Sequence, residues 1–435
     1  MKVALHTIGC KVNFAETSQI REKFEHMGYD ITEFGEEADI IILNTCTVTN
    51  KADADARKLI RRSKRKFPNA FIGVMGCYAQ LKPEEVAEIT GVDAVFGQDE
   101  KYNIPNIVHN MLGGEKTQVN VSCIDNLTFH EATTYDNESR TRAFIKLQDG
   151  CDYFCTFCTI PFARGRSRSM PFDRIASRFQ KAVEGGYKEA VISGINLGDF
   201  KVDTGQNFTD VVNLIDSLEY DIRVRISSIE PNLLTDGIID TVAAENKFVP
   251  HFHIPLQSGS PEILKKMKRR YKVEYYKELI AKIKDKITHC GIGVDVIVGF
   301  PGESDEHFKE TYDLLNSLPI SYLHVFTYSE RDLTPAAKYP NPVPERIRKE
   351  RTLLLRELSE VKKHKFYNEN LGSVRSVIPE TYDPISGTWK GWTENYIRVN
   401  LDAPADIDKS PKSCILQNIE GDCVNAVLAE VEIAK

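Results

Sequence analysis

The sequence predicts an α/β protein with three folded parts: a parallel-sheet domain, an open barrel of six βα units and a small C-terminal β-barrel. Two stretches in which short apolar strands alternate with amphipathic helices predict the first two parts, because this alternation is typical of parallel sheets. Residues 371–435 lose helical periodicity and show short alternating strands, which predicts the third part. At 435 residues the chain is long enough to bury several separate cores.

The first predicted domain covers residues 1–112 and is a Rossmann-like, doubly wound parallel sheet. Its expected strands lie at 2–7, 39–43, 70–75 and 94–96, and its expected helices at 15–27, 53–66 and 83–89. The polar segment 113–139 is poor in helical pattern, and we expect it to be a linker or a crossing loop.

The second predicted domain covers residues 140–370 and combines the barrel with a long charged helix at 344–370. Six βα units in succession predict an open barrel related to the eight-unit one, with its chemistry at the carboxyl ends of the strands. The expected strands lie at 143–147, 189–193, 223–227, 251–255, 293–298 and 322–326, and the expected helices at 172–184, 209–217, 260–267, 273–287 and 305–316. Strands at 373–379, 396–399 and 424–431 are expected in the C-terminal barrel.

Composition and charge exclude several classes of protein. With 41% hydrophobic and 27% charged residues the chain is neither disordered nor fibrous. No apolar run approaches the ~18–20 residues that span a bilayer, and the N-terminus is too polar for a signal peptide. We therefore expect a cytoplasmic protein with no membrane partner. The total net charge of −7 is unfavourable for binding a nucleic acid.

Three of the ten cysteines lie on one short segment, where Cys151, Cys155 and Cys158 form a CxxxCxxC pattern just after the first expected barrel strand. An iron–sulfur cluster needs several thiolates on one tight loop, and three local ligands leave one iron of a four-iron cluster open. Buried core cysteines, or a zinc site completed by a distant residue, are the alternative interpretations. Zinc is the weaker rival, since no histidine or fourth cysteine follows at finger spacing.

Three further cysteines are far apart in sequence, but each follows an expected strand of the N-terminal sheet: Cys10, Cys46 and Cys77. The carboxyl ends of parallel strands open onto one edge, so these side chains are expected to converge there. For any one of them alone a buried structural thiol is favoured, but three equivalent positions predict a second cluster with an open iron. The remaining cysteines share no such placement and are predicted to be structural: Cys123, Cys290, Cys414 and Cys423.

The CxxxCxxC pattern at the end of the first barrel strand resembles the radical S-adenosylmethionine superfamily. The resemblance implies that the open iron chelates the methionine moiety of the cofactor and that the reduced cluster generates a 5′-deoxyadenosyl radical. Polar and glycine-rich strand ends on the same rim are the expected contacts to the rest of the cofactor. These candidate residues are Gly194, Asn196, Ser228, Gly299 and Glu303.

A basic segment partly offsets the acidic total charge. Residues 57–66 contain seven basic side chains and no acidic one, and further arginines follow Cys158 closely. A solvated helix face is the ordinary interpretation of such a run, but phosphate neutralisation depends on local rather than total charge. We therefore expect RNA contacts from Arg57, Arg61, Arg62, Arg65, Arg164 and Arg166.

The three-part organisation with both cysteine triads resembles the methylthiotransferases over essentially the whole chain. Residues 9–13 (GCKVN), 44–53 (NTCTVTNKAD) and 328–337 (YSERDLTPAA) are similar to the members that modify N6-threonylcarbamoyladenosine in tRNA. This resemblance implies two [4Fe–4S] clusters, S-adenosylmethionine, an electron-donor protein, a sulfur source and a TRAM-like C-terminal barrel. It also implies radical insertion of sulfur at C2 of the adenine next to the anticodon, with methylation of that sulfur and no catalytic side chain beyond the cluster ligands.

Other substrates and one other class of protein are compatible with parts of this pattern. Related branches of the family act on isopentenyladenosine in tRNA or on an aspartate of a ribosomal protein. A non-catalytic iron–sulfur RNA-binding protein is the alternative of another class, although a purely structural cluster gains from a fourth protein ligand.

The C-terminal barrel carries a net charge of −4, which departs from what an RNA-binding module leads one to expect. We therefore expect RNA affinity to depend more on residues 57–66 and the rim of the central barrel. Trp389, Trp392 and Tyr396 are nevertheless candidates for stacking on bases from the surface of its sheet.

Overall fold

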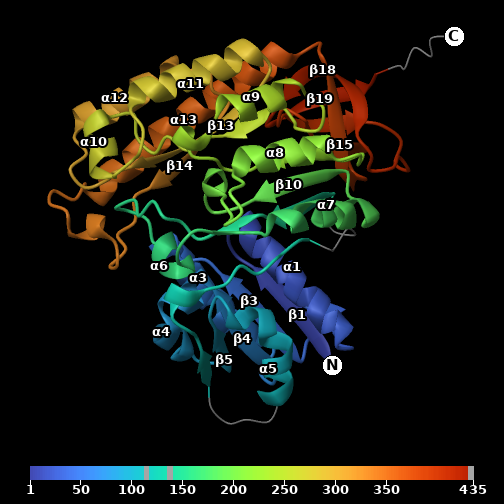
Figure 1. Cartoon of the computed structure of the whole chain (residues 1–435), viewed down its shortest axis with the longest axis vertical. Coiled ribbons are helices and arrows are strands. Elements are labelled where there is room, and N and C mark those ends of the chain that lie inside the picture. The colour runs from blue at the N-terminus through green and yellow to red at the C-terminus, as the bar shows by residue number, and fades with distance from the viewer. Residues whose placement is uncertain (112–116, 135–140, 430–435) are drawn as a thin grey trace.

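The computed structural model describes residues 1–111, 117–134 and 141–429. Three folded parts follow one another along the chain: the N-terminal sheet domain, a central barrel and a C-terminal β-barrel (Figure 1). Among the described helices, none has the length and apolar character needed to cross a membrane. The predicted fold class is confirmed in all three parts.

The N-terminal domain is built on a six-stranded parallel sheet with the order β2-β1-β3-β4-β5-β6. Its strands are β1 (Lys2–Thr7), β2 (Asp30–Thr32), β3 (Ile40–Thr45), β4 (Phe71–Gly76), β5 (Ala94–Phe96) and β6 (Gln118–Asn120). The four expected strands are present, and the two edge strands were not expected. Because β6 extends the sheet, the prediction that 113–139 is only a linker is wrong there. Three-residue edge strands are too short to show a period-2 pattern.

Helices cover both faces of this sheet. α1 (Lys11–His26) and α5 (Ile104–Met111) pack on one face, and α2 (Asn50–Lys66), α3 (Cys77–Leu81) and α4 (Pro83–Ala87) pack on the other. α1 begins four residues earlier than expected, directly after Cys10. α2 begins three residues earlier, because the Thr49 side chain accepts a hydrogen bond from the backbone N–H of Ala52 at 3.1 Å and caps the helix. The sheet is therefore doubly wound, as predicted.

The central barrel consists of two three-stranded parallel sheets, in the order β7-β10-β11 and β12-β13-β14. Its strands are β7 (Arg142–Lys146), β10 (Glu189–Ser193), β11 (Arg223–Ile226), β12 (His251–His253), β13 (Gly291–Val298) and β14 (Tyr322–Thr327). Single bridges from Val224 to Phe248 and from Ser228 to His253 join the two sheets. All six expected strands are present, and together they form the open barrel.

The helices of the central barrel pack on its outer face and enclose the largest hydrophobic core of the molecule. They are α7 (Ile175–Glu184), α8 (Phe208–Ser217), α9 (Asp236–Ala243), α10 (Pro261–Lys266), α11 (Val273–Lys286) and α12 (Asp305–Ser317). The short strands β8 (Gln148–Asp149) and β9 (Arg168–Ser169) and helix α6 (Ile160–Arg164) frame the loop that carries CxxxCxxC. The inner face of the strands therefore remains available for a ligand.

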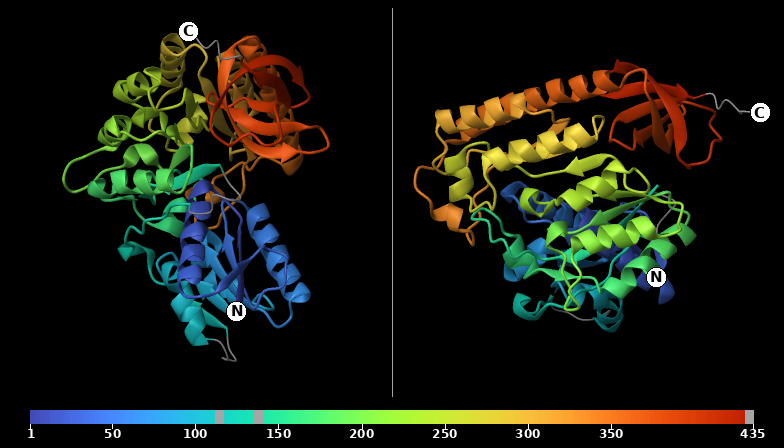
Figure 2. Two further views of the ribbon diagram at one scale, coloured as in Figure 1. Left: turned by 90° about the vertical axis from the view of Figure 1, so that its right-hand side faces the viewer. Right: turned by 45° about the horizontal axis from the view of Figure 1, so that its top comes forward.

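A long helix, α13 (Glu345–Asn370), runs along the outside of the central barrel and leads into the C-terminal barrel (Figure 2). That barrel is closed, with the order β15-β16-β17-β19-β18. Its strands are β15 (Val374–Asp383), β16 (Thr388–Thr393), β17 (Arg398–Asp402), β18 (Lys412–Glu420) and β19 (Cys423–Leu428).

The aromatic side chains of the C-terminal barrel do not form an open stacking surface, so that expectation is wrong. Trp389 is buried in the core of this barrel and its Nε1 donates to the carbonyl oxygen of Pro404 at 3.0 Å. Trp392 stacks on Tyr396 with ring centroids 4.5 Å apart, and Tyr396 lies 4.5 Å from the ring of His251 in β12. The C-terminal barrel thus closes the amino-terminal end of the central barrel.

Candidate functional site

Cys10, Cys46 and Cys77 converge at the carboxyl edge of the N-terminal sheet. They directly follow or lie close behind β1, β3 and β4, which are neighbours in the sheet. Gly9 has φ +135°, a conformation that disfavours side chains, and a Cβ there would lie 3.2 Å from the Cβ of Cys46. Gly9 therefore allows the turn into Cys10 to approach Cys46 closely.

Two thiols of this first triad, those of Cys46 and Cys77, have raised pKa values. Burial, followed by the neighbouring thiol of Cys77, raises the pKa of Cys46 to about 12. Burial also raises the pKa of Cys77. Each of these two thiols has a neighbour in the triad that disfavours its ionisation. A positively charged metal centre offsets the repulsion between thiolates and displaces the protons when it binds.

Cys151, Cys155 and Cys158 form the second triad, on the loop between β8 and α6. Burial is the main cause that raises the pKa of Cys151 to about 12 and raises the pKa of the other two thiols. Arg269 donates from Nη1 to the sulfur of Cys155 at 3.2 Å. Cys155 is therefore buried, with a positive charge beside its sulfur, whereas Cys151 and Cys158 are partly exposed.

Neither triad has the spacing of a single-ion site. Within the described residues, one group of histidine, cysteine or acidic side chains has ligand atoms that all lie within 4.8 Å of one another: His253, Asp295 and His324. The three thiols of neither triad lie this close together. Three thiolates on one tetrahedral zinc ion would lie roughly 4 Å apart, since Zn–S bonds are about 2.3 Å long. Thiolates bound to different irons of one cluster lie farther apart. The spacing favours multi-iron clusters over the zinc interpretation.

A cavity of about 190 Å³ is lined by Cys158 of the second triad and by residues that closely follow Cys46 of the first. Its lining comes from the segment after Cys46, from the CxxxCxxC loop and from the inner faces of β13 and β14. Lining residues include Val48, Thr49, Cys158, Thr159, Asp295 and Phe326. A molecule in this cavity would contact the surroundings of both triads at once.

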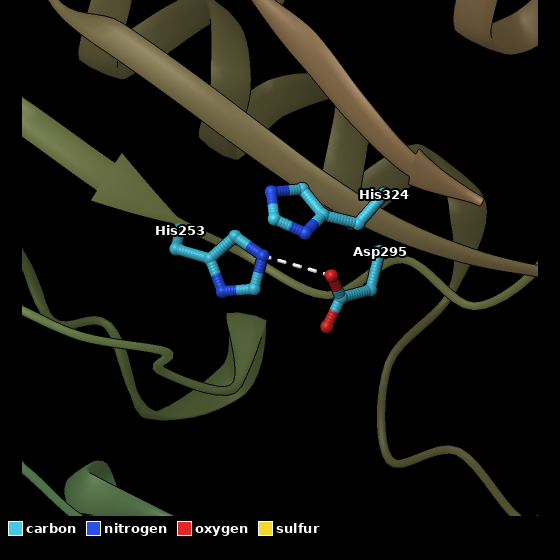
Figure 3. Close-up of side chains that lie close together, drawn as sticks. All are labelled: His253, Asp295 and His324. Carbon is cyan, nitrogen blue, oxygen red and sulfur yellow. Dashed lines mark hydrogen bonds and ion pairs between the residues drawn. The ribbon is translucent and has the colours of Figure 1, made fainter. Parts of the chain in front are cut away.

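Below this cavity, polar side chains project into the lumen of the central barrel. His253 Nε2 and Asp295 Oδ1 are 2.8 Å apart, and His324 lies beside them on the next strand (Figure 3). Lys11, at the start of α1, is near enough to Arg225 and Arg142 of the barrel strands for their charges to act on it. Burial, followed by the charges of Arg225 and Arg142, lowers the pKa of Lys11 to about 8. His253, Asp295 and His324 were not expected from the sequence, because single polar residues on strands resemble ordinary barrel interior.

The expected cofactor residues on β10 and β11 lie on the rim near Cys151. Asn196 is buried, with Nδ2 4.0 Å from the sulfur of Cys151, and its Oδ1 has no hydrogen-bond partner within the described structure. A buried, unsatisfied amide oxygen costs about 1–3 kcal/mol, so this atom suits a donor on a bound molecule. At Gly194 a Cβ would lie 2.9 Å from Leu197, and Ser228 bridges to His253.

The turn that contains Gly299 and Glu303 makes contacts with α13 that were not expected from the sequence. The backbone N–H of Gly299 donates to Glu303 Oε1 at 2.9 Å, and Arg351 of α13 donates to the same carboxylate at 2.5 Å. A side chain at Gly299 would meet Arg348 of α13 at 2.3 Å. The prediction of a direct cofactor contact from the Glu303 carboxylate is therefore corrected: this group holds the turn after β13 against α13.

The basic residues differ in accessibility. Arg61, Arg62 and Arg65 are exposed on α2. Arg57 is half-buried and its Nη1 donates to Tyr78 and to Glu85, each at 2.9 Å. Arg166 is exposed over 72% of its side chain and stacks on Phe154, whose ring centroid is 4.6 Å away. These positions leave at least four arginines accessible to a polyanion.

The prediction that Arg164 contacts RNA is wrong, because its side chain is completely buried. Its Nη1 lies 3.0 Å from Glu16 and 2.9 Å from Asp149. Lys101 and Lys146 also pair with Glu16, at 2.7 and 3.2 Å. Burial alone would favour protonated Glu16, but Arg164, Lys101 and Lys146 hold the pKa of Glu16 well below its usual range. We call these five residues the buried charge network.

The buried charge network joins the surroundings of the two triads. Arg164 ends α6, just after the CxxxCxxC loop, and donates to Asn13 Oδ1 at 2.5 Å. The same oxygen accepts from the sulfur of Cys10 at 3.6 Å. A second link connects the segment after β14 to the Cys46 segment, where Arg331 donates to Asp53 at 2.9 Å. The N-terminal domain is thus fixed on the barrel by buried ionic contacts beside both triads.

Two family models match the chain. The model described as uncharacterized protein family UPF0004 matches residues 2–97, and the radical SAM superfamily model matches residues 145–315. Among solved structures, the radical S-adenosylmethionine methyltransferase TsrM from Kitasatospora setae superposes with a TM-score of 0.55 and 14% identity. The superposition covers 77% of this chain and 75% of that one, and at this identity it shows a common fold.

Curated relatives match over almost the whole chain. The threonylcarbamoyladenosine tRNA methylthiotransferase MtaB of Aquifex aeolicus is 37% identical over 94% of this chain and 98% of its own length. The protein of the same name from Bacillus subtilis is 39% identical over 93% of this chain and 91% of its own. The tRNA-2-methylthio-N(6)-dimethylallyladenosine synthase of Fusobacterium nucleatum is 36% identical over 82% and 83%.

Proposed function

Because the chain belongs to the tRNA methylthiotransferase family of radical S-adenosylmethionine enzymes, we propose that it adds a methylthio group to C2 of N6-threonylcarbamoyladenosine in tRNA, next to the anticodon. The observation that carries this proposal is the cavity of about 190 Å³ that Cys158 and the segment after Cys46 both line. It offers one place where a base can meet both the surroundings of Cys46 and those of Cys158.

The enzyme uses S-adenosylmethionine and two [4Fe–4S] clusters. We assign one cluster to Cys151, Cys155 and Cys158 and the other to the triad of Cys10, Cys46 and Cys77, each with one iron left open. The bound cofactors supply the radical that removes hydrogen from C2 and the sulfur and methyl group that replace it. An electron-donor protein and a sulfur source are the further partners that this chemistry requires, and we propose the cytoplasm as its location.

The side chains of this protein position and shield the reacting groups. Asn196 Nδ2 lies 4.0 Å from the sulfur of Cys151, and its Oδ1, which has no partner within the described structure, would accept a hydrogen bond from the bound cofactor. Arg269 stabilises negative charge at Cys155. A tRNA base must leave its stack to reach the cavity, which costs a few kcal/mol. Val48 and Phe326 are exposed apolar side chains of the cavity, and contact between them and the base offsets part of this cost.

Mass spectrometry of tRNA nucleosides tests the proposed function. Cells that lack the gene should accumulate N6-threonylcarbamoyladenosine and lose its 2-methylthio derivative, and the gene should restore it. A change confined to the dimethylallyladenosine derivatives would assign the second substrate, which the Fusobacterium nucleatum relative's name suggests. Unchanged methylthio-adenosines of both kinds would refute the proposal.

The exposed arginines of α2 should contribute strongly to tRNA binding. Replacing Arg61, Arg62 and Arg65 by glutamate should weaken tRNA binding at least about tenfold, because each arginine neutralises a phosphate. The slope of the logarithm of the affinity against the logarithm of the salt concentration should fall by the share of roughly three phosphate contacts. Filter binding of tRNA over a range of salt concentrations measures both quantities.

A matched control makes the same charge change elsewhere. Arg346, Lys349 and Arg356 are exposed on α13, outside the central barrel, and their replacement by glutamate should weaken binding much less. Equal loss in the two triple variants would mean that total charge, rather than the α2 surface, governs binding. Removal of residues 371–435 is a poorer control, since Arg225 donates to the backbone of Glu394 and Tyr396 packs on His251.

A further inference from the structure

The CxxxCxxC loop carries an exposed aromatic ring between its first two cysteines. Phe154 is 37% exposed, although its neighbours Tyr153 and Cys155 are buried. Its backbone has φ +50°, a left-handed conformation that is uncommon for a bulky residue. An exposed ring in a costly backbone conformation favours a functional role over simple packing. Because Phe154 directly precedes Cys155, this ring lies one residue from a sulfur of the second triad.

Basic side chains surround the exposed ring. The guanidinium carbon of Arg166 lies 4.6 Å from the centroid of the Phe154 ring. Arg166 Nη1 and Lys201 Nζ lie 3.7 and 3.5 Å from the carboxylate of Asp152. Arg270 Nη2 donates to the carbonyl oxygen of Asp152 at 3.0 Å. Three exposed cations therefore gather around one residue of the loop.

A fourth exposed cation, Lys268, is placed beside the loop by the residues that flank it. The backbone N–H of Thr156 donates to the carbonyl oxygen of Met267 at 3.2 Å, and Arg269 Nη1 donates to the sulfur of Cys155 at 3.2 Å. The segment that carries Lys268 thus packs against the loop on both sides of this residue. We call the exposed ring and these four cations the loop patch: Phe154, Arg166, Lys201, Lys268 and Arg270.

The loop patch has an excess of positive charge. In the part of the chain that the structure describes, its four cations form ion pairs with two carboxylates, those of Asp152 and Asp199. The residues of the patch are not among those that line the cavity proposed for the base, whereas Cys158, at the other end of the loop, is. A partner on the patch and a substrate in the cavity therefore contact different parts of one loop.

We propose that the loop patch docks an acidic electron-carrier protein, which passes one electron to the cluster assigned to Cys151, Cys155 and Cys158. This inference rests on the proposed function, which requires a reductant from outside the chain. The carrier loses one electron to the cluster, and no proton, bond or group is transferred in this step.

Both the position and the charge of the loop patch suit such a carrier. Electron transfer slows steeply with distance, so the carrier must dock where a sulfur ligand lies just below the surface, and buried Cys155 directly follows exposed Phe154. Excess positive charge speeds the encounter with an acidic partner. A small interface also suits a carrier that must leave after each electron.

Binding of an acidic plant-type ferredoxin, a low-potential one-electron carrier, tests the proposal. The reconstituted holoenzyme should bind this ferredoxin at low salt. Lys201→Glu combined with Lys268→Glu should raise the dissociation constant at least about tenfold, because two attractive charges become repulsive. The difference should shrink as the salt concentration rises, since exposed charges are screened. Titration calorimetry over a range of salt concentrations measures both effects.

Lys282→Glu combined with Lys286→Glu is the matched control. Both lysines are exposed and pair with a carboxylate, as Lys201 does. They lie near the end of α11, which leads to the amino end of β13, whereas the loop patch lies at the carboxyl ends of the strands. This variant should bind ferredoxin nearly as tightly as the wild type.

Three results would overturn the inference. One is a wild type that does not bind the ferredoxin at low salt, and another is equal weakening in the two double variants. The third concerns RNA: the Lys201→Glu, Lys268→Glu variant should bind tRNA as tightly as the wild type. If its affinity for tRNA falls as much as its affinity for ferredoxin, the loop patch is a surface for RNA.

Failure of the proposed function has a different signature. Formation of 5′-deoxyadenosine is measured with reduced ferredoxin, below its dissociation constant, and with a chemical reductant. The ratio of the two rates should fall in the Lys201→Glu, Lys268→Glu variant by about the factor by which ferredoxin binding falls. Enzyme that shows this fall but forms no methylthio product from any tRNA would refute the proposed reaction and leave the docking surface intact. Methylthio product with an unchanged ratio would do the reverse.

Discussion

Replacement of Cys155 by alanine should abolish the formation of 5′-deoxyadenosine from S-adenosylmethionine. The second triad offers three thiols, and the loss of one leaves two for a cluster that already lacks a fourth protein ligand. Removing Cys155 also leaves the guanidinium of Arg269 without its partner sulfur at 3.2 Å. We expect activity to fall below detection, at least about a thousandfold, since no acid–base group of the chain can replace radical chemistry. Anaerobic turnover with a chemical reductant and chromatography of 5′-deoxyadenosine measure this effect.

A variant of the other triad separates the two proposed clusters. Replacement of Cys10, Cys46 and Cys77 by alanine should leave 5′-deoxyadenosine formation in place, eliminate the methylthio product, and lower the iron content from about eight to about four atoms per chain. Cys423→Ala is the control, because this half-buried thiol lies in the C-terminal barrel and should change neither quantity. Loss of 5′-deoxyadenosine formation in the triple variant, or retention of it in Cys155→Ala, would contradict the assignment of roles to the two triads.

The convergence of Cys10, Cys46 and Cys77 was predictable because it follows from topology alone. Once β1, β3 and β4 are recognised as parallel neighbours, residues after them must meet at one edge. The polar group of His253, Asp295 and His324 was not predictable in this way. Its residues lie on β12, β13 and β14, whose order is known only after the barrel is built.

The incorrect predictions about single side chains have one physical cause in common. Local sequence reveals the charge or ring of a side chain but not the partner that a distant element brings to it. Arg164 was expected to meet phosphate and instead meets Glu16, which is 148 residues away. Glu303 is held by Arg351 of α13, and Tyr396 packs on His251 of the central barrel. In each case a contact with an element distant in sequence decides what the side chain does.

Replacement of Arg164 by methionine should lower the free energy of unfolding by about 3–5 kcal/mol. The side chain is completely buried between Glu16 and Asp149, so its removal leaves two buried carboxylates with one cation fewer. Methionine fills much of the volume but donates no hydrogen bond. Urea unfolding, followed by circular dichroism, measures the change. Arg346→Met removes an exposed arginine that pairs with Glu350, and this control should change stability by less than about 1 kcal/mol.

The dependence of stability on pH distinguishes this ionic role from simple packing. Arg164 helps to hold the pKa of Glu16 and of Asp149 well below the usual range in the folded state. Such groups stabilise the fold above their unfolded pKa of about 4, and this contribution is lost as the pH falls towards the folded pKa. In Arg164→Met the two pKa values lie closer to those of the unfolded chain, so stability should fall less steeply below about pH 5. An unchanged slope would mean that the Arg164 side chain acts only by filling space.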